Sequence, residues 1–129
     1  TLISALTAAT QRIGLGATVS TSFGEPYHVA RTFASIDHLS KGRAAWNVVT
    51  SSASKAALNF SREEHMGHDL RYEVAQEFVD VVKGLWDCWE DGAIVADKAT
   101  GVYIDPSKVR PLDHRPTRAA FSRVLYETA

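Results

Sequence analysis

The sequence predicts an α/β fold in which parallel strands are joined by crossover helices. Apolar side chains alternate between helical spacing and short strand-like runs, in the order helix, strand, helix, strand, helix. Both strand-like runs are almost free of charge, which is typical of strands that are covered on both faces. Two parallel strands make a poor sheet by themselves, because they need neighbouring strands and a cover on each face. We therefore expect this chain of 129 residues to be one part of a larger fold.

The first strand is expected to follow a short helical segment. Residues 2–9 place Leu2, Leu6 and Ala9 on one face, as at the end of a helix. Residues 12–20 then form an apolar run with almost no charge, and this run predicts the first buried strand.

The second helix and the second strand are expected next. The helix begins at Pro26, since the missing N–H of proline would be unpaired in a first turn anyway. Gly42 marks its end. The apolar side chains at helical spacing between these points are Val29, Phe33, Ile36 and Leu39. Residues 44–50 form the second strand, and a polar, alanine-rich connection runs from Ser51 to about Gly67.

The longest helix is predicted from about Asp69 to Trp89. It has one continuous apolar face, made of Leu70, Val74, Phe78, Val81, Val82, Leu85, Trp86 and Trp89. Beyond it, residues 93–104 resemble two short extended segments around a turn. Residues 115–129 are compatible with a further short helix.

Composition excludes several classes of protein. The chain is 45% apolar and 22% charged, which is typical of a folded globular domain. Its net charge of −1 and the lack of a basic stripe argue against nucleic-acid binding. No apolar run reaches the roughly 18 residues that a membrane span needs. Cys88 is the only cysteine, so no disulfide can form within the chain, and a reducing, cytoplasmic setting is expected.

Three local patterns are better explained by structure than by chemistry. Gly14 and Gly16 resemble part of a dinucleotide fingerprint, but Val19 stands where the third glycine should be, so close packing explains them better. His65 and His68 have no third ligand at the usual spacing of a zinc site, and no metal is expected. The single thiol, next to apolar helix positions, is expected to be buried rather than nucleophilic.

The ends of both predicted strands are rich in polar side chains. They are Thr18, Ser20 and Thr21 in the first strand, and Asn47, Thr50, Ser51 and Ser52 in the second. In parallel α/β folds, ligands bind at the carboxyl ends of the strands, so these groups could hydrogen-bond one ligand. Capping of the loops by serine and threonine explains the pattern equally well, and the sequence leaves both explanations open.

A second polar group opens the longest helix, in the order His68, Asp69, any residue, Arg71 and Tyr72. His68 and Tyr72 lie one turn apart and therefore share a helical face. Near a helix N-terminus both could reach a phosphate, which the helix dipole and the free N–H groups also favour. In the alternative interpretation, Asp69 caps the helix and the two rings only face solvent.

Three long stretches resemble the bacterial-luciferase-like flavin monooxygenases, within them the branch of nitrilotriacetate monooxygenase, dibenzothiophene-sulfone monooxygenase and the pristinamycin-synthesis oxygenase. They are GLGATVSTSFGEPYHVARTFASIDHLSKGRAAWNVVTS, AALNFSREEHMGHDLRYEVAQEFVDVVKGLWDCWEDGAI and TGVYIDPSKVRPLDH. The resemblance covers roughly residues 1–114 and implies a partial (β/α)8 TIM barrel, with about two βα units, the third and fourth, plus an insertion. Residues 115–129 depart from the family pattern, and we hypothesise a truncated or frame-shifted tail.

The resemblance also implies an activity. Such enzymes bind reduced FMN without a covalent link, and a separate NAD(P)H:flavin reductase supplies it. With O2, the enzyme inserts one oxygen atom into a small organic substrate. The alternative is a non-catalytic α/β fragment that self-associates without binding flavin. In either case we expect homo-oligomers, because an incomplete barrel leaves open strand edges.

Site residues follow from the same resemblance. Thr18, in the GLGAT stretch, matches a flavin-contacting threonine. His68 and Tyr72 match the His and Tyr of an HDxRY motif near the FMN phosphate and ribityl chain. Asn47 and Thr50, in NVVTS, match a strand end that lines the flavin pocket. An acidic residue from earlier strands and a serine from later strands, which also hold the flavin in the family, have no counterpart here, and no catalytic residue is assigned.

Overall fold

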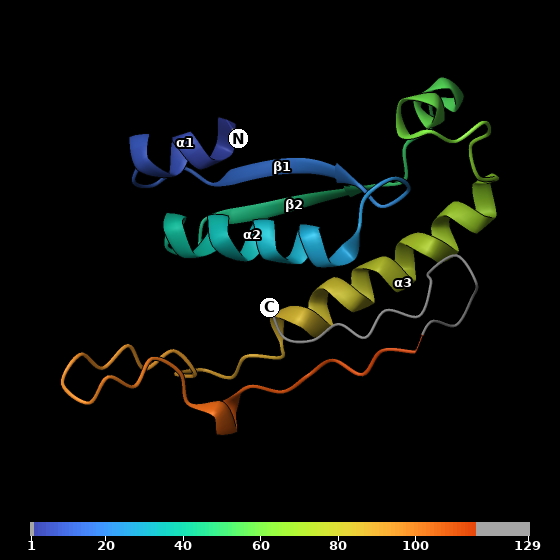
Figure 1. Ribbon diagram of the computed structural model, residues 1–129. Coiled ribbons are helices and arrows are strands. Elements are labelled where there is room, and N and C mark those ends of the chain that lie inside the picture. Colours follow the sequence, from blue (N-terminus) through green and yellow to red (C-terminus); the bar gives the residue numbers. More distant parts are fainter. Residues whose placement is uncertain (1, 116–129) are drawn as a thin grey trace.

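The computed structural model describes residues 2–115 and has the predicted alternation of helices and strands (Figure 1). Its elements are α1 (Leu2–Ala9), β1 (Leu15–Ser20), α2 (Pro26–Ser40), β2 (Ala44–Val49), the 3-10 helix η1 (Ser54–Phe60), α3 (His68–Trp86) and the short 3-10 helix η2 (Pro106–Lys108). The order helix, strand, helix, strand, helix is therefore confirmed. The further helix proposed for residues 115–129 lies outside the described residues, apart from Arg115.

The two strands are parallel, as predicted, and α2 is the crossover helix between them. Their register pairs Leu15 with Ala44 at one end and Ser20 with Val49 at the other. The helix begins at Pro26, as the sequence indicated. It ends in a left-handed residue, Lys41, whose backbone N–H donates to carbonyls of the last helical turn.

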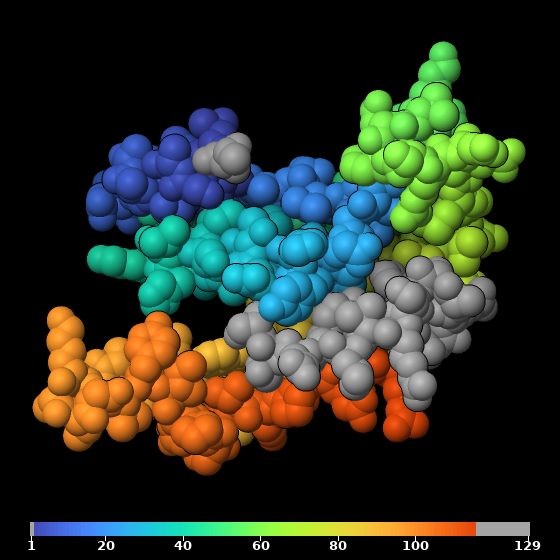
Figure 2. Space-filling model, in the orientation of Figure 1, coloured from blue at the N-terminus to red at the C-terminus, as the bar shows by residue number. Residues whose placement is uncertain are grey.

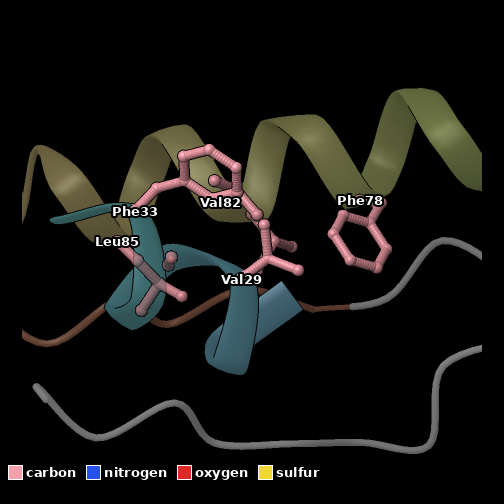
Figure 3. Packing of buried hydrophobic residues seen from close by; sticks show 7 residues of the cluster. Val29, Phe33, Phe78, Val82 and Leu85 are labelled. Carbon is pink, nitrogen blue, oxygen red and sulfur yellow. The ribbon is translucent and has the colours of Figure 1, made fainter. Parts of the chain in front are cut away.

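One face of the sheet carries the core, because α2 and α3 both pack against it. Figure 3 shows side chains of the two helices pointing toward one another. The buried cluster consists of Val29, Ala30, Phe33, Phe78, Val81, Val82 and Leu85, with Ala17, Val19, Tyr27, Trp46 and Leu112 packed against it. The ring centroid of Trp46 lies 5.9 Å from those of Phe33 and Phe78. Its indole nitrogen also donates to the carbonyl of Val19, at 3.0 Å.

The opposite face of the sheet is open. The residues on it alternate with those of the core face, as the pleat of a strand requires. Gly16, Thr18, Ala45 and Asn47 are exposed there, whereas Ser20 and Val49 are half-buried. The sequence predicted strands covered on both faces. That expectation applied to a fold larger than this chain; within residues 2–115 the helices that pack on the sheet cover only one face and an edge.

The chain after α3 departs from the predicted boundaries. The helix ends at Trp86 rather than Trp89, because the chain turns back and Trp89 forms an antiparallel bridge with Val109. A second antiparallel bridge joins Ile94 to Ile104 and confirms the two extended segments around a turn. Figure 2 shows this orange segment at the periphery of the molecule, along the bottom of the view.

Candidate functional site

The candidate site lies at the edge of the sheet where both strands end. Figure 1 shows the first turn of α3 at this same end, beyond the arrowheads of β1 and β2. A hydrogen bond joins these parts, since Nη1 of Arg71 in α3 donates to the carbonyl of Ser51, just after β2, at 2.6 Å. The polar strand tips and the start of the long helix, which the sequence linked to one ligand, are therefore neighbours.

Thr18 and Asn47 form a polar pair on the open face of the sheet. They are direct partners in the strand register, and both are exposed. Nδ2 of Asn47 donates to Oγ1 of Thr18, at 3.1 Å. Because the threonine oxygen accepts this bond, its hydroxyl hydrogen points away from Asn47. The pair thus offers a ligand one hydroxyl donor and one amide acceptor from the same flat surface.

The other hydroxyl groups at the strand ends close the loops. Thr21 and Ser22 are buried, with 2% and 3% of their surface exposed. Their hydroxyls donate to the carbonyls of Val49 and Thr50 respectively. For these two side chains, loop capping is therefore the correct interpretation. Thr50 itself is half-buried and follows directly after β2, beside this turn.

His68 and Tyr72 share one face of the first turn of α3, as predicted. Their ring centroids are 4.9 Å apart, and both side chains are exposed. Nδ1 of His68 donates to Oδ1 of Asp69 at 2.8 Å, which leaves Nε2 as the ring atom that can contact a ligand. In the alternative interpretation Asp69 caps the helix and both rings face solvent. The cap is wrong, because Gly67 occupies the N-cap position and no side chain caps the helix, whereas both rings are indeed exposed.

The sequence placed Ser51 among the polar groups at the strand ends, but it indicated no contact between Ser51, His65 and the guanidinium of Arg71, which meet at this edge. Nε2 of His65 donates to the carbonyl of Ser51 at 2.8 Å, beside the bond from Arg71. Ser51 has a left-handed backbone, with φ at 52°, and its hydroxyl donates to that of Ser20 at 2.7 Å. No local pattern in the sequence identifies the partners of the Ser51 carbonyl, which lie 14 and 20 positions away.

Neither a metal cluster nor a membrane-spanning helix is found within residues 2–115. No group of three or more His, Cys, Asp or Glu side chains there is arranged to hold a metal ion. None of the helices in that range combines the length and the apolarity that crossing a membrane requires.

Known proteins resemble this chain in sequence and in structure. Residues 1–119 match the family model of the luciferase-like monooxygenases. N-acetyl-S-(2-succino)cysteine monooxygenase of Bacillus subtilis (strain 168) is 57% identical over 115 residues, which cover 89% of this chain and 26% of that protein. Dibenzothiophene-sulfone monooxygenase of Rhodococcus erythropolis is 50% identical over 113 residues, covering 88% of this chain and 25% of that protein.

A solved structure extends the likeness to three dimensions. The crystal structure of riboflavin lyase with modified FMN and substrate riboflavin matches with a TM-score of 0.83 and 43% identity, over 90% of this chain and 26% of that one. The chain spans about a quarter of the length of the relatives it matches. The predicted resemblance and the predicted fold class, a partial (β/α)8 barrel of the luciferase-like type, are confirmed.

Proposed function

The chain belongs to the luciferase-like monooxygenase family, and we propose that it forms one wall of the FMN site in a two-component monooxygenase. In this proposal a separate NAD(P)H:flavin reductase supplies reduced FMN, and one oxygen atom of O2 enters a small organic substrate. The observation that carries the proposal is the hydrogen bond from Arg71 to the carbonyl of Ser51, which joins the first turn of α3 to the end of β2. The turn that carries His68 and Tyr72 therefore lies at the end of the sheet whose open face carries Thr18 and Asn47.

The groups at this edge fit the chemistry of FMN. A flavin has a flat polar ring system at one end and an anionic phosphate at the other. The open face of the sheet offers a flat surface with the hydroxyl of Thr18 and the amide of Asn47. The first turn of α3 offers free backbone N–H groups and a favourable helix dipole for a phosphate, beside two exposed rings.

Each side chain then has a specific task. Thr18 donates a hydrogen bond to the ring system, Asn47 accepts one, and Thr50 lines the same strand end. The phenol of Tyr72 and Nε2 of His68 contact the phosphate or ribityl end. Bound FMN supplies the redox chemistry with O2, whereas these residues bind and orient it.

The test uses a complete barrel, made by grafting residues 1–114 into the Bacillus subtilis relative in place of its matching segment; we call it the grafted barrel. FMN is titrated under reducing conditions and after oxidation, and binding is followed by flavin fluorescence. We expect binding, and we expect His68→Ala and Tyr72→Phe each to weaken it about tenfold, since each removes one hydrogen bond to a charged or polar ligand group.

Matched substitutions at exposed positions outside the site serve as controls. His38→Ala, in the last turn of α2, and Tyr103→Phe, in the peripheral segment, should leave FMN affinity unchanged. Unchanged affinity in both site variants would remove the assignment of His68 and Tyr72. A folded grafted barrel that binds no FMN would reject the proposed function itself.

The alternative is a non-catalytic fragment that self-associates without flavin, and the exposed apolar surface favours it. Leu2, Ile13 and Leu58 are 72%, 62% and 64% exposed, and the two-stranded sheet within residues 2–115 also leaves strand edges unpaired. We expect the 129-residue chain alone to form homo-oligomers or larger species in sedimentation velocity. A monodisperse monomer that melts cooperatively would contradict this. Self-association of the chain together with a grafted barrel unable to bind FMN would favour the alternative.

A further inference from the structure

We propose that Arg71 is a positioning residue that sets the first turn of α3, and with it His68 and Tyr72, against the strand ends. It acts through the carbonyl of Ser51. The functional consequence of this inference rests on the proposed function, because it matters for the cofactor only if the two rings contact FMN.

The contact itself is strong and specific. Nη1 of Arg71 donates to the carbonyl of Ser51 at 2.6 Å, in a part-buried position. A charged donor makes a shorter and stronger hydrogen bond than a neutral one. Nε2 of His65 lies 2.8 Å from the same oxygen and 3.2 Å from Nη1 of Arg71. A carbonyl only accepts, so both nitrogens donate to it and do not bond each other.

Ser51 is suited to receive these bonds because it joins several elements. Its backbone is left-handed, with φ at 52°, a conformation that nonglycine residues rarely adopt. Its hydroxyl donates to that of Ser20, at the end of β1, at 2.7 Å. Ser51 lies two residues after the end of β2, and its carbonyl accepts the bonds from Arg71 and His65. Arg71 therefore fixes α3 relative to both strands through one residue.

The position of Arg71 on the helix explains how it controls the two rings. It lies three residues after His68 and directly before Tyr72, about 80° around the helix axis from the mean direction of the two rings. A hydrogen bond from the side of the helix to a carbonyl outside it limits rotation of this turn about the helix axis. The direction of both exposed rings then depends on this bond.

The hydrogen-bond inventory favours positioning over simple stabilisation. Nε of Arg71 and Nδ1 of His65 are buried without a hydrogen-bond partner within residues 2–115. Burying an unpartnered polar atom is unfavourable, and apolar residues of similar size would stabilise the contact between α3 and the strand ends better. The guanidinium of Arg71 therefore provides a directed hydrogen bond to Ser51 rather than apolar burial.

Arg62 provides a matched control in the same corner. Its Nη1 also donates to a backbone carbonyl, that of Ser22, at 3.0 Å. Its guanidinium lies 5.8 Å from the ring centroid of Phe23. It thus makes the same kind of contact, but it joins the loop after η1 to the loop after β1 and does not hold α3.

The first experiment needs no cofactor and uses the full 129-residue chain. Hydrogen–deuterium exchange is compared between Arg71→Met and Arg62→Met, at the amides of residues 72–75. We expect exchange there to rise about tenfold in Arg71→Met and to stay unchanged in Arg62→Met. Arg71→Lys should restore part of the protection, because it keeps a charged donor without the planar fork. Equal exchange in the two methionine variants would overturn the inference.

The second experiment measures FMN affinity in the grafted barrel with a double-mutant cycle. We expect Arg71→Met to weaken binding about tenfold and Arg62→Met less than about twofold. If Arg71 acts through His68, the combined loss in Arg71→Met with His68→Ala is smaller than the product of the single losses. A combined loss equal to that product would overturn the positioning role. If the unsubstituted grafted barrel binds no FMN, the proposed function fails, and the exchange experiment still decides the role of Arg71.

Discussion

Replacing Phe78 by alanine should be one of the most damaging single changes to this chain. The side chain is fully buried, at 0% exposure, and its ring centroid lies 5.9 Å from that of Trp46 at the sheet–helix interface. Burial of such a ring contributes about 1.5–3 kcal/mol, and the aromatic contact adds about 0.5–1.5 kcal/mol. The cavity left behind brings the expected loss in the free energy of unfolding to about 3–5 kcal/mol. A typical domain has only about 5–15 kcal/mol to lose.

The matched control is Phe60→Ala, the same truncation at an exposed position. Phe60 is 52% exposed and stacks on Phe23, with ring centroids 4.5 Å apart. Its loss should cost no more than about 1.5 kcal/mol, the upper value for an aromatic pair. Urea unfolding of both variants is followed by far-ultraviolet circular dichroism at several protein concentrations, because self-association shifts the midpoint. Equal midpoints for the two variants would refute the described core.

Three further predictions concern single side chains. Lys41→Gly should raise the free energy of unfolding by about 0.5–1 kcal/mol, since φ is 59° there and glycine adopts this conformation without strain; an unchanged urea midpoint would contradict it. Cys88 is 6% exposed, and burial raises the pKa of its thiol despite the nearby Arg110, so iodoacetamide should modify it slowly at pH 8 unless urea is added. Hydrogen bonds from Thr100 and from the backbone of Ala99 lower the pKa of Asp97, so its carboxyl should titrate below 3.8 by NMR. A lowered pKa means that this turn is most stable above that pH and loses stability as the pH falls through the lower value.

The sequence predicted the helices and strands well because their signals are local. Pro26 marked the first residue of α2, and the apolar face of α3 followed the helical period. The same period extended α3 wrongly to Trp89, which continues the stripe but pairs with Val109 across the peripheral segment. The bridge from Trp89 to Val109 joins residues far apart in sequence, so the helical spacing of apolar side chains gives no sign of it. The 3-10 helix η1 was missed because its alanine-rich sequence has no apolar stripe.

The candidate site could be predicted only in part, for the same physical reason. Strand alternation places Thr18 and Asn47 on definite faces, but the hydrogen bond between them joins residues 29 positions apart. The bond from Arg71 to Ser51 spans 20 positions and ends on a backbone carbonyl, which every residue possesses. No side-chain pattern can therefore reveal it. The incorrect cap assignment for Asp69 had a local cause, because an acidic residue in a first turn resembles a cap.

The core and the candidate site lie on opposite faces of the same two strands. Packing in the core therefore determines which side chains reach the site. Trp46 points into the core and Asn47, the next residue, points to the open face. A slip of β2 by one residue would exchange them, exposing an indole and burying an amide without its partner. An unpaired buried polar group costs about 1–3 kcal/mol, and the lost burial of the indole adds to that. The packing of Trp46 against Phe33 and Phe78 thus selects the register in which Asn47 meets Thr18.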